Sequence, residues 1–217
     1  MNAPLRSLAS SVLLLGGVAG GLAGQAATPP LAPVLPEERE IALARSAAPS
    51  QVSADADVYV LRRGGHVKAV SGSSGVACIV ARDHPESVYP ICYNAEGART
   101  VLRSEIRRQQ LREQGWTEER IEAEIDRALA AGELFVPQAP AMAWMMSPQQ
   151  VIYASAAGPR VGQWHPHMMI YMPGASERAL GLVETPGADV FLIDAGKATA
   201  HLIVKTPTWS DGARDGS

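Results

Sequence analysis

The sequence has no large excess of either charge and, after its first 30 residues, no long apolar run. Its 19 Lys and Arg residues stand against 22 Asp and Glu residues, which gives a formal net charge of −3. Proteins that bind nucleic acid usually carry a basic stripe, and the sequence has none, so we expect no nucleic-acid partner. A membrane-spanning helix needs roughly 20 consecutive apolar residues. We therefore expect no transmembrane anchor in the mature chain.

Cysteine is scarce, because the chain has only Cys78 and Cys92. Two cysteines allow a single intramolecular disulfide, and such a pair tends to cross-link in the oxidising compartments that exported proteins reach. We predict a Cys78–Cys92 disulfide, which closes a loop of about 14 residues and stabilises the fold by about 3 kcal/mol. The alternative interpretation takes Cys92, which precedes a helix start, as a nucleophile beside a histidine.

Two signatures of catalysis are missing. Ser147 lies in MMSPQQ, without the flanking glycines of a serine-hydrolase elbow. The glycine-rich GSSG segment at 72–75 precedes a strand-like run and not a helix, so it is not a phosphate-binding loop. The sequence therefore leaves any catalytic residues unassigned.

The first 26 residues have the three-part layout of a secretory signal peptide. A short basic start precedes the apolar run from Leu8 to Ala23, and the small residues Gly24 and Ala26 suit a signal-peptidase site. We predict cleavage after Ala26 and a periplasmic or secreted protein. Residues 27–56 are interpreted as a proline-rich tether that includes a short helix at 37–47.

Residues 57–206 have the pattern of one folded domain. Residues 57–82 predict a three-stranded meander with a turn at Gly64-Gly65 and a buried face that includes Cys78. Strand-like runs return from residue 141 onward. The tail, residues 207–217, is polar and is expected to be flexible.

Two helices are expected between these groups of strands. Asn94 can cap a helix from about Ala95 to Glu113, and Thr117 can cap a second helix that ends at Gly132. We interpret their many Glu and Arg residues as a solvated face. Strands, then two helices, then strands indicate an α+β fold, in which a mostly antiparallel sheet has two helices packed on one face.

The segment GQWHPHMMIYMPG at 162–174 is the strongest candidate for a site. On a strand, alternate residues share a face. One face would then carry Trp164, Met168, Ile170 and Met172 toward the core. The other would carry His165, His167, Met169 and Tyr171, and this uncharged mixture is typical of a cleft wall.

We predict that His165 and His167 are metal ligands and that Trp164, Met169 and Tyr171 bind a small ligand. A His-x-His pair places two imidazoles on one ion, and zinc or copper would suit them. Such an ion needs a third protein ligand, for which spacing does not choose among His66, His84, His201, Asp83, Glu86 and Glu184. The alternative interpretation is that both histidines line a wall and bond only to backbone carbonyls and water.

Three functions are compatible with this stretch. The first is an exported module that binds a small ligand or a transition metal. The second is a metal-dependent hydrolase at the same histidines, with Asp83 or Glu86 as the base. The third is a non-catalytic structural protein of the cell envelope. The sequence leaves the oligomeric state open.

Four segments resemble a family of exported bacterial proteins that have no assigned activity. They are EIALARSAAPSQVSADADVYVL at 40–61, PICYNAEGARTVL at 90–102, AWMMS at 143–147 and WHPHMMIYMP at 164–173. The resemblance covers most of the mature chain and implies a shared fold and export. It implies no mechanism and no catalytic residues.

Overall fold

The computed structural model describes residues 32–154, 158–183 and 187–216. The predicted signal peptide at 1–26 lies outside the described residues. The strands are β1 (Asp57–Arg62), β2 (Gly65–Val70), β3 (Ala77–Ala81), β4 (Tyr89–Tyr93), β5 (Ala141–Met145), β6 (Ile152–Tyr153), β7 (Arg160–Gly162), β8 (His167–Tyr171), β9 (Val190–Ile193) and β10 (His201–Lys205). The helices are α1 (Glu37–Arg45), α2 (Ser50–Ser53), α3 (Ala95–Arg99), α4 (Val101–Glu113), α5 (Glu118–Ala130) and α6 (Glu177–Leu180).

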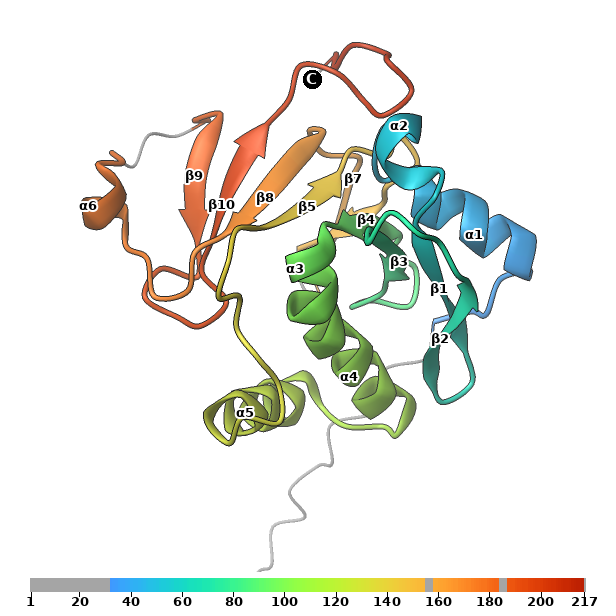
Figure 1. Ribbon diagram of the computed structural model, residues 1–217, viewed down its shortest axis with the longest axis horizontal. Coiled ribbons are helices and arrows are strands. Elements are labelled where there is room, and N and C mark those ends of the chain that lie inside the picture. The colour runs from blue at the N-terminus through green and yellow to red at the C-terminus, as the bar shows by residue number, and fades with distance from the viewer. Residues whose placement is uncertain (1–31, 155–157, 184–186, 217) are drawn as a thin grey trace, which may run out of the picture.

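The strands form one eight-stranded sheet in the order β2-β1-β3-β4-β5-β8-β10-β9, and β6 and β7 form a separate pair (Figure 1). Every neighbouring pair in the large sheet is antiparallel except β1 and β3. The predicted α+β fold with a mostly antiparallel sheet in a single domain is confirmed. Among the described residues, no helix has both the length and the apolar composition that a bilayer crossing requires.

The first three strands do not form the predicted meander, because β3 pairs with β1 in parallel and not with β2. The loop before β3 crosses the start of β1. There, the Gly72 backbone N–H donates a hydrogen bond to the Asp57 carboxylate over 2.9 Å. A Cβ atom at Gly72 would lie 2.1 Å from the Asp55 carbonyl oxygen, so only glycine allows this close approach. The loop thereby delivers β3 to the free edge of β1.

The β1–β2 hairpin forms, with its turn one residue earlier than predicted. Arg62 pairs with Gly65, so Arg63 and Gly64 make the turn. Gly64 has φ +92°, in the left-handed region that favours glycine.

One face of the sheet is covered by α3 and α4. The predicted single helix at 95–113 is divided at Thr100, where φ is −117° and ψ is −80°. The predicted cap is confirmed, because the Asn94 side chain accepts a hydrogen bond from the Gly97 N–H over 2.9 Å. Leu102 of α4 joins the main core against the sheet. Of the two helices predicted for this face, α4 packs on the sheet, whereas α5 packs on α4.

The opposite face of β1, β3 and β4 is covered by α1, which lies beside them in Figure 1. The short helix predicted at 37–47 therefore forms, but it belongs to the domain and not to a tether. Leu43 and Ala44 are buried in the core on this face. The Arg82 Nη2 atom lies 2.8 Å from Glu40 Oε2, and both side chains of this ion pair are buried.

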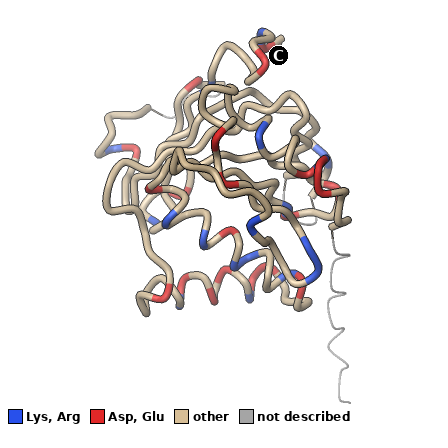
Figure 2. The backbone as a smooth tube through the Cα atoms, turned by 45° about the vertical axis from the view of Figure 1, so that its right-hand side comes forward, with Lys and Arg blue, Asp and Glu red and all other residues tan. Residues whose placement is uncertain are grey.

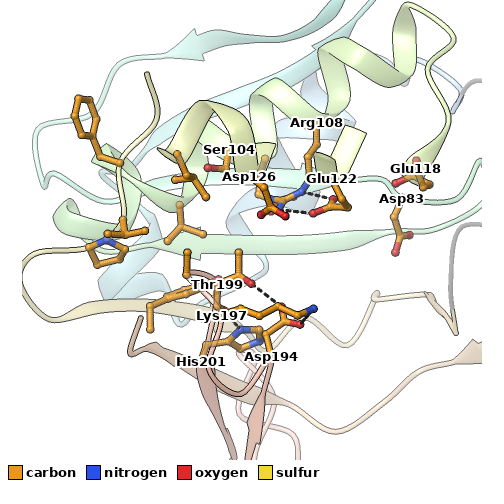
Figure 3. Close-up of a pocket in the computed structure, with 18 of the residues that line it drawn as sticks. Asp83, Ser104, Arg108, Glu118, Glu122, Asp126, Asp194, Lys197, Thr199 and His201 are labelled. Atoms are coloured by element: carbon orange, nitrogen blue, oxygen red, sulfur yellow. Dashed lines mark hydrogen bonds and ion pairs between the residues drawn. The ribbon is translucent and has the colours of Figure 1, made fainter. Parts of the chain in front are cut away.

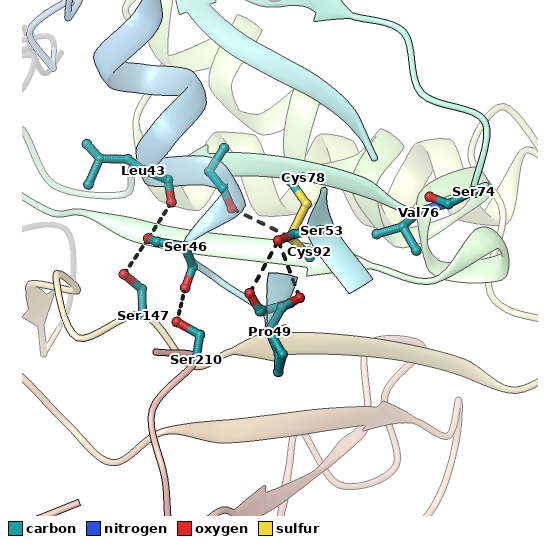
Figure 4. Close-up of a disulfide and its surroundings, with 12 residues drawn as sticks. Leu43, Ser46, Pro49, Ser53, Ser74, Val76, Cys78, Cys92, Ser147 and Ser210 are labelled. Atoms are coloured by element: carbon teal, nitrogen blue, oxygen red, sulfur yellow. Dashed lines mark hydrogen bonds between the residues drawn. A yellow bond between two sulfur atoms is a disulfide. The ribbon is translucent and has the colours of Figure 1, made fainter. Parts of the chain in front are cut away.

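The predicted disulfide joins Cys78 of β3 to Cys92 of β4, which face each other in register (Figure 4). Both cysteines are fully buried on the α1 face, so Cys78 points into the core as predicted. The described residues contain no free cysteine, and Cys92 is therefore not the nucleophile of the alternative interpretation.

The segment after β10 folds back onto the domain, in contrast to the expected flexible tail at 207–217. Trp209 is 6% exposed. The Ser210 N–H donates to the Met146 carbonyl oxygen over 2.8 Å, and its hydroxyl donates to the Ser46 carbonyl oxygen over 2.6 Å (Figure 4). The reason is local, because these two hydrogen bonds and the burial of an indole hold the chain against the ends of α1 and β5.

A row of paired residues crosses the sheet on the α1 face, and its burial changes from strand to strand. The row contains Val58, Cys78, Cys92, Trp144, Met168, Val204 and Val190. The first three side chains are completely buried, the next three are half-buried, and Val190 is 37% exposed. We call β1, β3 and β4 the covered half and β5, β8, β10 and β9 the open half.

On the α4 face, the corresponding row stays inside. It contains Ala77, Tyr93, Ala143, Met169, Ile203 and Phe191. The first five are buried, and Phe191 packs partly buried against the same core. The main core of the domain therefore extends from β1 to β9 on this face only.

Candidate functional site

The WHPH stretch is only partly a strand, because β8 begins at His167 and residues 164–166 precede it as irregular chain. The assignment of its two faces is also corrected. Met169 lies in the main core, whereas Met168 and Ile170 are half-buried on the other face. Both faces of this strand are apolar, so the position of the covering helices, and not the composition, decides which one meets the core.

His167 is a buried histidine held by the backbone. Its Nδ1 donates a hydrogen bond to the His165 carbonyl oxygen over 2.8 Å, and the side chain is 3% exposed. Burial lowers the pKa of His167 to about 4, so the ring is neutral at pH 7. The Trp164 ring packs edge-on at 4.9 Å between centroids. His167 therefore has the geometry of a satisfied core histidine.

His165 bonds to a different part of the chain. Its Nδ1 lies 2.6 Å from Asp215 Oδ2, in the segment that folds back after β10. Trp164 and His165 line a cavity of about 710 Å³ whose wall includes Phe191. Residues 184–186, which adjoin this cavity in sequence, lie outside the described residues. Glu184, a candidate third metal ligand, is among them.

The described residues hold no group of three His, Cys, Asp or Glu side chains placed to bind one metal ion. His66 uses Nε2 to donate to the Val80 carbonyl oxygen over 3.1 Å, and burial lowers its pKa to about 4. His84 stacks on Tyr153 at 3.7 Å between ring centroids, and its Nδ1 accepts a hydrogen bond from the Glu86 N–H. These candidate ligands are thus engaged away from His165 and His167.

A further candidate, Glu86, accepts a hydrogen bond from the Tyr153 hydroxyl. The last two candidates, Asp83 and His201, line a different cavity of about 830 Å³, which we call the helix–loop groove (Figure 3). One wall is formed by α4 and α5, and the opposite wall by the loop between β9 and β10. Tyr171 of β8 also lines it. Sites for small organic ligands typically have volumes of about 300–1,000 Å³, so the groove has a suitable size.

The last residue of β8, Tyr171, and the first residue of β10, His201, each supply a ring to the groove. The Tyr171 and His201 ring centroids are 5.2 Å apart. Burial raises the pKa of Tyr171, so its hydroxyl stays protonated at neutral pH. The His201 Nδ1 donates to the Thr199 carbonyl oxygen over 2.9 Å, so Nε2 is the ring nitrogen left for a ligand.

The loop wall is held in shape by Asp194. One of its carboxylate oxygens lies 2.9 Å from Lys197 Nζ, and the other accepts a hydrogen bond from the Thr199 hydroxyl over 2.8 Å. Asp194 has φ +55°, a left-handed backbone that a short polar side chain tolerates when it bonds locally. Figure 3 shows Asp194, Lys197, Thr199 and His201 together, opposite Ser104, Arg108 and Asp126.

The helix wall is strongly charged. Figure 2 shows acidic positions recurring along α5 and basic positions along α4. Arg108 is 2.7 Å from a Glu105 oxygen and 2.8 Å from a Glu122 oxygen. Burial acts to lower the pKa of Arg108, but the two carboxylates outweigh it and raise the pKa. Such paired charges fix the shape of the wall.

An apolar segment, residues 135–137, continues the groove after α5. Phe135 is 58% exposed, whereas large apolar side chains are usually buried. An exposed aromatic ring at the rim of a cavity offers a ligand a flat apolar contact.

The structure divides the predicted site residues among three places. Trp164 and His165 line the smaller cavity, His167 and Met169 are buried in the domain, and only Tyr171 lines the helix–loop groove. Sequence reasoning missed the helix wall because its Glu and Arg residues also suit a solvated face. The signal that could have marked it is Phe135, one of only two phenylalanines, directly after a highly charged helix.

Comparison of the chain with family models, with curated proteins and with solved structures gives no match. The resemblance of the WHPH-type segments to an exported bacterial family therefore stays a prediction.

Proposed function

We propose that the protein is an exported binding module for a small organic ligand, which the helix–loop groove holds. The observation that carries this proposal is the groove itself, with its volume of about 830 Å³ and its combination of apolar and polar walls. Ligand sites are typically concave, with apolar surfaces and a few fixed polar groups. The predicted ligand-binding residue Tyr171 belongs to this site, whereas Trp164 and Met169 do not line it.

The state of the groove's side chains favours binding over hydrolysis. The ion pairs of Arg108 and the hydrogen bonds of Asp194 fix both walls before any ligand arrives, which lowers the entropic cost of binding. A metal-dependent hydrolase would need three protein ligands for its ion. The described residues supply no such group at His165 and His167 or elsewhere.

Export is part of this proposal. The residues at 1–26 have the layout of a signal peptide, and the structure contains the Cys78–Cys92 disulfide, a bond that persists in oxidising compartments. N-terminal sequencing of the exported protein is expected to begin at Ala27. A sequence that begins at Met1 would contradict export by this route.

A groove-filling substitution tests the proposed site. Ala198 is exposed on the loop wall and lines the groove, so Ala198→Trp is expected to fill it. Ala195 is exposed in the same loop but does not line the groove, so Ala195→Trp is the matched control. Ligand-observed NMR with a library of small organic fragments compares the disulfide-bonded protein with the two variants.

The expected result is a set of fragments that bind the unsubstituted protein and Ala195→Trp and that lose binding to Ala198→Trp by at least about ten-fold, which is about 1.4 kcal/mol. If every fragment binds both variants equally, the groove is not the site and the proposed function fails.

A further inference from the structure

We propose that the groove selects an organic cation, specifically a protonated amine joined to an apolar body. This inference rests on the proposed function and adds the chemical class of the ligand. It follows from which charged groups on the walls are already paired, which are not, and what lies beside them.

The cationic side chains of the groove are all engaged by carboxylates. Arg108 is held by Glu105 and Glu122. Arg112 makes two hydrogen bonds of 2.8 Å, one to each carboxylate oxygen of Glu118. Lys197 Nζ lies 2.9 Å from an Asp194 carboxylate oxygen. An anionic ligand would have to displace one of these carboxylates, and it would leave that carboxylate without its partner.

One acidic side chain on the walls, Asp126, is not engaged in this way. Asp126 is exposed on α5 and makes no hydrogen bond or ion pair with another described residue. Asp83 lines the far end of the groove beside Glu118 (Figure 3), where Arg112 and the hydroxyls of Tyr89 and Ser87 already act on its carboxylate. Asp126 is therefore the carboxylate that a ligand ammonium can approach without displacing a partner.

The acidic side chains of the groove also give it a negative electrostatic potential, which favours a cation. The pKa of Lys197 is raised, first by its hydrogen bond to Asp194 and in smaller part by Asp126 and Glu122 across the groove. This shift of Lys197 shows that acidic side chains of the helix wall favour positive charge in the groove.

The neighbouring groups suit the rest of such a ligand. The His201 Nε2 can accept a hydrogen bond from an ammonium, because Nδ1 is committed to the Thr199 carbonyl oxygen. Phe135 and the residues after it supply an apolar surface in the same cavity. An ammonium near the acidic groups and an apolar body against Phe135 would therefore use both kinds of wall in one molecule.

Three probes of nearly equal shape test the charge preference. They are 2-phenylethylamine, 2-phenylethanol and phenylacetate, which are cationic, neutral and anionic at pH 7. Their affinities for the full disulfide-bonded chain are measured by NMR titration. We expect the amine to bind roughly five-fold more tightly than the alcohol, since about 1 kcal/mol separates a unit charge from a neutral group near one opposite charge in water. The anion is expected to bind most weakly.

A pair of variants assigns the preference to the groove. Asp126→Asn is expected to reduce amine binding to the level of the alcohol and to leave alcohol binding unchanged. Asp189→Asn is the control, because Asp189 is 83% exposed and lies outside the groove. Its removal is expected to change neither affinity.

The outcomes separate this inference from the proposed function. If the three probes bind equally and Ala198→Trp abolishes all of them, the groove is a binding site but not for cations, and only this inference fails. If the amine binds equally well to Ala198→Trp, both fail for this ligand. If none of the probes binds while groove-dependent fragments are anionic, the cation preference is likewise refuted.

Discussion

The covered half and the open half belong to the same sheet, yet they are held together differently. In the covered half, α1 and α4 bury both faces, a disulfide joins β3 to β4, and a buried ion pair joins α1 to the residue after β3. In the open half, the α4 face is buried. The opposite face, which carries Trp144, Met168 and Val204, is only half-buried. The helix–loop groove lies where the α4–α5 pair meets the end of the open half.

This difference indicates where the molecule can tolerate change. In the covered half, helices pack against the side chains on both faces of the sheet. A substitution on either face therefore disturbs close packing. The groove uses the end of the sheet where the chain folds into loops, and binding residues are often placed on loops that a rigid scaffold positions. The following three tests compare the halves, from the largest expected effect to the smallest.

The buried ion pair gives the largest contrast. Arg82→Met leaves the Glu40 carboxyl buried without its partner, and breaking such a pair costs about 4 kcal/mol of unfolding free energy. In the open half, Lys205 lies 3.7 Å from Asp189, which is 83% exposed, so Lys205→Met is expected to cost less than about 1 kcal/mol. Urea unfolding at pH 7 measures both. Equal losses would contradict the difference between the halves.

Two buried histidines test whether the α4 face is equally buried at β2 and at β8. His66 beside the covered half and His167 in the open half have pKa values lowered to about 4 by burial. The folded pKa lies below the unfolded value of about 6.5, so at pH 7 the folded ring is neutral and the unfolded ring is mostly neutral. As the pH falls below 6.5, the unfolded state binds the proton first and stability is lost until about pH 4.

Each histidine is expected to remove about 2.5 kcal/mol of unfolding free energy at pH 4.5 relative to pH 7. His66→Gln and His167→Gln should each reduce that pH dependence by a similar amount, because both histidines are buried on the α4 face of the sheet. Urea unfolding at the two pH values measures this. An unchanged slope in either variant would show that its histidine is not buried and neutral.

Matched valines give the smallest effect and the most direct comparison. Val60 of β1 is completely buried, and Val204 of β10 is half-buried on the same face of the sheet. Val60→Thr places a hydroxyl in the core without water and is expected to cost about 2 kcal/mol. Val204→Thr is expected to cost less than about 0.5 kcal/mol, since its hydroxyl can reach solvent. Thermal unfolding compares them, and a larger loss for Val204→Thr would mean that this face is covered.

Local features of the fold could be predicted from the sequence. The disulfide followed from the count of two cysteines, and the helix starts followed from Asn94 and Thr117, whose side chains accept hydrogen bonds from backbone N–H groups as expected. The caps depend only on residues close in sequence, and two cysteines can pair in only one way. The α+β class followed from the order of strand-like and helical segments along the chain.

Features that depend on long-range packing could not be predicted. The parallel pairing of β3 with β1 depends on a close backbone contact at Gly72, and alternation of residues does not reveal it. The faces of β8 were assigned wrongly because both are apolar. The groove joins side chains from Asp83 to His201, and no local pattern links positions so far apart.

The hydrogen bond between Ser46 and Ser210 has a consequence for the order of events during synthesis. It joins residues 164 positions apart, so it forms only after synthesis has passed residue 210. Until then, the end of α1 lacks the segment that later packs against it. A nascent chain that has released only its first hundred residues therefore carries an incomplete N-terminal layer, and final closure of the domain is among its last folding steps.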